Sequence, residues 1–140
     1  MALLVPNVGE AKMLGYIVNN ATGMVNPTLR LFSNNQTPTS TQTIADYTEA
    51  TFTGYAAVIQ TGSSWTITAG DGSTGFSKAT TNSASTFTCS GTTSQSVYGY
   101  YVDANTSTLL WAERFSDGPY TIANVGDKVI ITPVLTLSTT

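Results

Sequence analysis

The chain has 140 residues with no histidine and one cysteine, and only 9% of its residues are charged. Most hydrolytic and proton-transfer chemistry at neutral pH uses histidine, a thiolate or paired carboxylates in a cleft. A Ser-His-Asp or Cys-His arrangement is therefore excluded, as is a metal site built from histidines or a cysteine cluster. We expect a protein that is not an enzyme and that holds no cofactor and no metal.

The net charge is −3, and the five basic residues are spread along the chain: Lys12, Arg30, Lys78, Arg114 and Lys128. A nucleic-acid partner needs a clustered basic patch, so none is expected. No apolar stretch approaches the roughly 20 residues of a membrane span, so no membrane partner is expected either. A surface with so few charges is poorly protected against self-association, which favours a homo-oligomer or a subunit docked on a larger lattice.

The length fits a single domain covering residues 1–140, in which 1–22 form a helical contact segment and 23–140 a β-sandwich. The helix is expected over 7–19, with Asn7 as its cap and Glu10 completing a capping box. Apolar residues recur at helical spacing along it: Val8, Ala11, Leu14 and Val18.

The rest of the chain is typical of strands and turns. Strands are expected at 28–33, 51–60, 64–68 and 86–89, a hairpin at 97–103 and 109–115, and a long closing strand at 129–137. The alternation in 64–68 indicates a half-buried strand. With no alternating helices, the pattern predicts a mainly β protein: one antiparallel β-sandwich or jelly-roll-like domain with a short N-terminal helix.

The acidic residues offer little chemistry. The only close carboxylate pairs, Asp46 with Glu49 and Glu113 with Asp117, lie among residues typical of exposed turns, where solvated charge is expected. Three aspartates could in principle bind calcium, but they do not form the dense acidic loop of a dedicated site: Asp71, Asp117 and Asp127. The single cysteine, Cys89, is interpreted as a small buried apolar residue.

The aromatic residues of the β-region allow three interpretations. Strand parity places Tyr98 and Tyr100 on the face opposite Tyr101, so one set can be core while the other is exposed. The set as a whole could be core, a subunit interface or a platform on which sugars stack.

Several segments resemble one group of proteins: GYYVD at 99–103, LLWAERF at 109–115, GPY at 118–120, LVPNVGE at 4–10, LRLFSNN at 29–35 and EATFTGY at 49–55. Together they are similar to small structural proteins of tailed bacteriophages. The resemblance implies a virion component, made in the host bacterial cytoplasm, that acts as a capsid cement or decoration protein. Such a protein sits on the capsid surface as an oligomer, typically a trimer, and bridges copies of the major capsid protein.

On that interpretation the N-terminal segment is expected to supply lattice or inter-subunit contacts through Leu3, Leu4, Val5, Met13, Leu14 and Ile17. The alternative is a receptor-binding or lectin-like module of a tail fibre or capsid spike. That module would bind host glycans through Tyr98, Tyr100 and Trp111.

Overall fold

The computed structural model describes residues 4–18, 26–70, 76–104 and 107–138, apart from the side chains at 14, 17, 18, 76, 137 and 138. The elements in chain order are α1 (Asn7–Val18), β1 (Pro27–Phe32), η1 (Ile44–Asp46), β2 (Val58–Ile59), η2 (Gly62–Ser64), β3 (Trp65–Thr68), β4 (Phe76–Thr81), β5 (Ser85–Thr88), β6 (Gln95–Val97), β7 (Gly99–Ala104), β8 (Leu109–Arg114), β9 (Tyr120–Ile122), β10 (Lys128–Ile131) and β11 (Val134–Ser138). The predicted class, mainly β and antiparallel with one short N-terminal helix, is confirmed.

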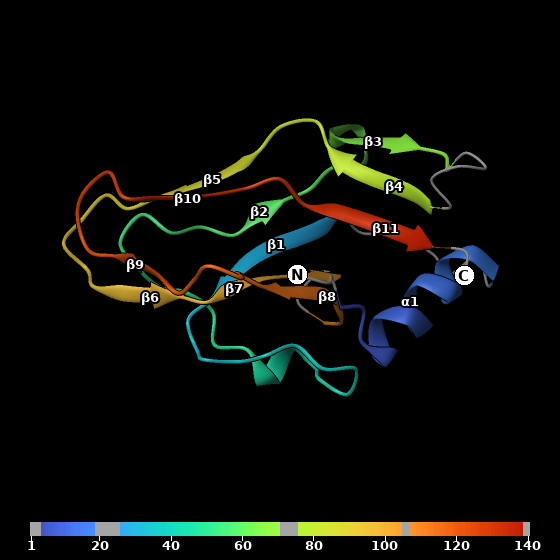
Figure 1. The fold of residues 1–140 in the computed structure, drawn as a ribbon, viewed down its shortest axis with the longest axis horizontal. Coiled ribbons are helices and arrows are strands. Elements are labelled where there is room, and N and C mark those ends of the chain that lie inside the picture. Colours follow the sequence, from blue (N-terminus) through green and yellow to red (C-terminus); the bar gives the residue numbers. More distant parts are fainter. Residues whose placement is uncertain (1–3, 19–25, 71–75, 105–106, 139–140) are drawn as a thin grey trace.

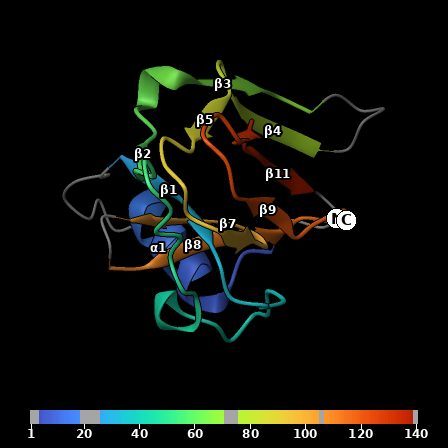
Figure 2. The same cartoon turned by 90° about the vertical axis from the view of Figure 1, so that its left-hand side faces the viewer.

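The strands of the described residues form four antiparallel sheets with orders β2-β1-β7-β8, β10-β5, β11-β4-β3 and β6-β9. The four-stranded sheet makes one layer of a sandwich-like arrangement, and β5, β10 and β11 run over it as the other (Figure 1). Seen from the side, the β11-β4-β3 sheet stands at the top (Figure 2). Helix α1 lies against β8, the outermost strand of the four-stranded sheet.

The main core fills the space between these layers. It joins residues from both: Leu29, Leu31, Val102 and Trp111 of the four-stranded sheet with Phe87, Val129 and Ile131 of the β10-β5 sheet. On β5 the buried and exposed positions alternate, as the sequence predicts for 86–89. Cys89, just after β5, is 1% exposed, so its interpretation as a buried apolar residue is confirmed.

The four-stranded sheet is covered on both faces, which corrects one expectation. Successive strand residues point to opposite faces, and Tyr100 packs in the main core while Tyr101 joins a second cluster. That second cluster consists of Phe32, Tyr47, Tyr101, Leu109 and Ala112. The segment carrying η1 supplies Tyr47 and lies beneath the sheet (Figure 1). Tyr98, expected on the face of Tyr100, lies between β6 and β7 and packs against the second cluster with Tyr101 instead.

Helix α1 follows the predicted range closely but uses a different cap and a different face. The Glu10 N–H donates to the Pro6 carbonyl oxygen at 3.0 Å, so Pro6 precedes the first turn and Asn7 already belongs to the helix. Val8 is 40% exposed, whereas Gly9 is buried and Met13 packs on the main core. The inward face therefore lies one position away from the predicted apolar series.

Gly9 permits the contact between α1 and β8. An ideal Cβ at this position would lie 2.3 Å from the carbonyl oxygen of Leu110 and 2.9 Å from that of Leu109. We expect Gly9→Ala to push the helix off β8 and to lower the free energy of unfolding by about 1–3 kcal/mol, although alanine is the better helix former. Urea denaturation measures the change. Gly62→Ala is the matched control, because nothing lies within 4 Å of a Cβ there; equal stability of both variants would contradict the expectation.

Two strand predictions need correction. The expected strand 51–60 is reduced to β2, because Gly54, at φ +90°, turns the chain and the Tyr55 N–H bonds back to the Phe52 carbonyl oxygen. The expected closing strand 129–137 is two strands, β10 and β11, which pair with different sheets. Pro133 lies at the break, where it cannot donate to a ladder.

Strand β3 forms where 64–68 predicts it, but it is not half-buried. Ile67, the apolar residue expected inside, is 79% exposed, so nothing in the described part of the chain covers the face of β3 that carries it. The hairpin of β7 and β8 has the predicted position, with Tyr101 opposite Ala112 and a register shift between Val102 and Asp103.

Candidate functional site

The N-terminal contact residues that the structure describes are engaged within the chain. The Leu4 backbone pairs with Ala112 on the edge of β8 through hydrogen bonds of 3.2 and 3.0 Å. Val5 and Met13 pack against the main core. Leu3 and the side chains of Leu14 and Ile17 lie outside the described residues, so their role as partner contacts stays a prediction.

The residues of the glycan alternative do not form an exposed platform. Tyr100 is 4% and Trp111 3% exposed, and the Trp111 ring meets Trp65 edge-on with centroids 6.2 Å apart. Tyr98 is half-buried beneath the Arg114 guanidinium, which lies 5.2 Å from its ring centroid. The core interpretation is confirmed for Tyr100 and Trp111. The expectation that these two rings stack against sugars is corrected, because both are buried on a sheet that is covered from both sides.

The most concentrated charge cluster of the described residues centres on Arg30 of β1. Its Nε donates to Asp103 Oδ2 at 2.5 Å, and its Nη1 donates to both carboxylate oxygens of Glu49 at 2.8 and 2.9 Å. Asp103, on the neighbouring β7, is fully buried. The Tyr55 hydroxyl donates to Glu49 Oε1 at 2.9 Å and accepts from the Leu31 N–H at 3.1 Å. We call Arg30, Glu49, Tyr55 and Asp103 the Arg30 network.

The electrostatics of the Arg30 network hold the guanidinium charged and the phenol neutral. Burial alone would lower the pKa of Arg30, but the hydrogen bonds to Asp103 and then Glu49 outweigh it and raise that pKa. Burial raises the pKa of Tyr55 well above its usual range, the Leu31 N–H opposes this, and Glu49 adds to it. The network therefore compensates the buried Asp103 carboxylate and joins β1, β7 and the segment after η1.

Sequence reasoning missed this network. It treated Glu49 as a solvated partner of Asp46 and Glu113 as one of Asp117, whereas Glu49 binds Arg30, and Glu113 accepts a 2.6 Å hydrogen bond from the Tyr100 hydroxyl. Arg30 lies at an alternate position between Leu29 and Leu31, which is also the pattern of an ordinary outward-facing residue. No signal in the local sequence separates the two cases.

No group of three or more metal-ligating side chains occurs within the described ranges, and Asp71 falls outside them. Asp127 caps a turn: its Oδ2 accepts the backbone N–H groups of Ala123 and Asn124, both at 2.8 Å. These two hydrogen bonds lower the pKa of Asp127. In the described part of the chain, no helix is long and apolar enough to cross a membrane.

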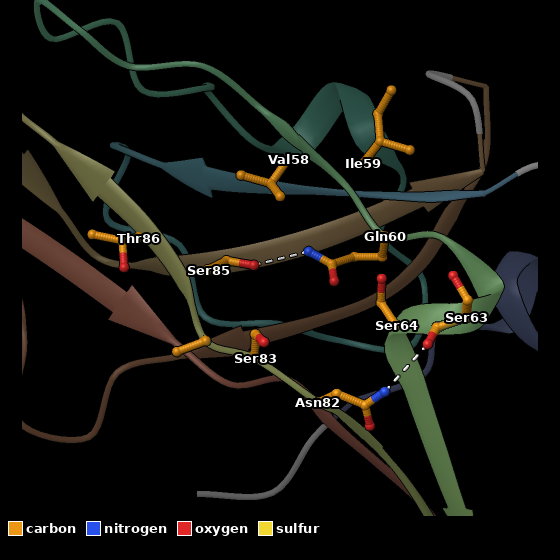
Figure 3. A pocket seen from close by; sticks show the side chains of 10 residues that line it. Val58, Ile59, Gln60, Ser63, Ser64, Asn82, Ser83, Ser85 and Thr86 are labelled. Atoms are coloured by element: carbon orange, nitrogen blue, oxygen red, sulfur yellow. Dashed lines mark hydrogen bonds between the residues drawn. The ribbon is translucent and has the colours of Figure 1, made fainter.

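A pocket of about 510 Å³ lies between β2 and the segment entering β5 (Figure 3). It is lined by residues 58–60, 63–64 and 82–86, none of them charged and none aromatic. Gln60 and Ser85, 4% and 7% exposed, cross it with a hydrogen bond of 2.9 Å from Gln60 Nε2 to Ser85 Oγ. At one end Asn82 Nδ2 donates to the Ser63 carbonyl oxygen at 3.2 Å. The pocket size falls within the range of small-ligand sites.

Comparison with known proteins gives no relative: no family model, no curated protein and no solved structure matches this chain.

Proposed function

We propose that this chain is a non-enzymatic structural protein of a tailed bacteriophage virion, of the capsid cement or decoration type. It binds the outer capsid surface as a homo-oligomer, as a trimer if it follows the proteins that it resembles, and contacts the major capsid protein. It holds no cofactor and binds neither nucleic acid nor membrane.

The observation that carries the proposal is how few charges the fold leaves on its surface. Several of the five basic and eight acidic residues are engaged by hydrogen bonds inside the chain. Among them are Arg30, Glu49 and Asp103 in the Arg30 network, Glu113 with Tyr100, Arg114 with the Gln36 carbonyl oxygen, Asp46 with Thr43, and Asp127 with the Ala123 and Asn124 N–H groups. A surface this poor in charge suits permanent packing against protein better than free solution.

Exposed isoleucines on sheet edges support the same proposal. Ile59, Ile67 and Ile130 are 64%, 79% and 61% exposed, and each lies on the outermost strand of its sheet. Open edges that carry apolar side chains are liabilities that a stable contact covers. The engagement of Leu4, Val5 and Met13 within the chain moves the proposed contact surface from the N-terminal segment to these edges.

Copy number in the purified virion tests the proposal. A cement protein is present in proportion to the major capsid protein, whereas a receptor-binding module at a tail tip is present in few copies. Quantitative mass spectrometry of purified particles is expected to give the capsid-proportional number. A tail-like copy number would refute the cement proposal and favour the receptor-binding alternative.

A charge at the edge of β3 is expected to weaken capsid binding. Ile67→Glu replaces a side chain whose burial stabilises a contact by about 1.5–3 kcal/mol, so affinity for capsids lacking the protein should fall by about tenfold or more. Thr68→Glu places the same charge on the opposite face of the same strand and serves as the control. Co-sedimentation with capsids measures both, and undiminished binding of Ile67→Glu would remove β3 from the contact surface.

A further inference from the structure

We draw no further inference here: the strongest candidate, the pocket between β2 and the segment entering β5, is crossed by the hydrogen bond from Gln60 Nε2 to Ser85 Oγ, and nothing in the structure shows what would occupy it.

Discussion

Replacing Arg30 with methionine is expected to lower the free energy of unfolding by about 3–5 kcal/mol. The substitution keeps an unbranched chain of similar length but leaves the Asp103 carboxylate, which is fully buried, without its guanidinium. For a buried carboxylate, the loss of its guanidinium costs far more stability than the net value of the intact ion pair. Urea denaturation at neutral pH measures the loss, which is a large part of the stability of a small domain.

Two further variants make this expectation specific. Lys128→Met removes an exposed cation from β10 and should change stability by no more than about 0.5 kcal/mol. Adding Asp103→Asn to Arg30→Met removes the stranded charge, and the double variant should regain part of the loss. A loss below about 1 kcal/mol for Arg30→Met, or a double variant that is less stable still, would show that the network does not compensate Asp103.

The second large effect is a loss of stability in alkaline solution. Burial raises the pKa of Tyr101 to about 12, with Glu49 adding to the effect, and burial together with Asp46 raises that of Tyr47 to about 12. Burial also raises the pKa values of Tyr55 and Tyr100, with Glu49 and Glu113 as the respective neighbours that add to it. These phenols ionise more readily in the unfolded chain, where their pKa is about 10.

The direction follows from proton binding. Above pH 10 the unfolded chain has released protons that the folded chain keeps, so the unfolded state binds fewer protons and stability falls as pH rises. The stabilisation is complete below pH 10 and is lost toward pH 12, at about 1.4 kcal/mol per pH unit for each such tyrosine. Tyr101→Phe removes one of them and should make the decline shallower by about that amount. Denaturation curves from pH 8 to 11.5 test this, and a stability difference between the two proteins that does not change with pH would contradict it.

The Arg30 network and the pocket between β2 and β5 show why local patterns predicted elements better than sites. The β7–β8 hairpin lies close to its predicted position because two β-prone runs and a short polar loop are a local signal. Arg30 and Asp103 are 73 positions apart, and they meet because β1 pairs with β7. A pairing between distant strands is decided by the whole fold, and local patterns in a single sequence do not predict it.

The amino-acid sequence by itself determined the class of the protein and the chemistry that its side chains can supply. The mainly antiparallel β domain is specified by strand-length apolar alternation, turn residues and one helical period. The available reactions are limited by the absence of histidine and the scarcity of charge. These properties follow from composition and short-range periodicity. Tertiary structure alone decided which side chains are exposed. The β1, β7 and β8 strands are covered on both faces, so Tyr100 and Trp111 are buried, whereas Ile59 and Ile67 are exposed because no described segment packs over them. The physical reason is that burial depends on what packs against a strand, and those segments come from distant parts of the chain.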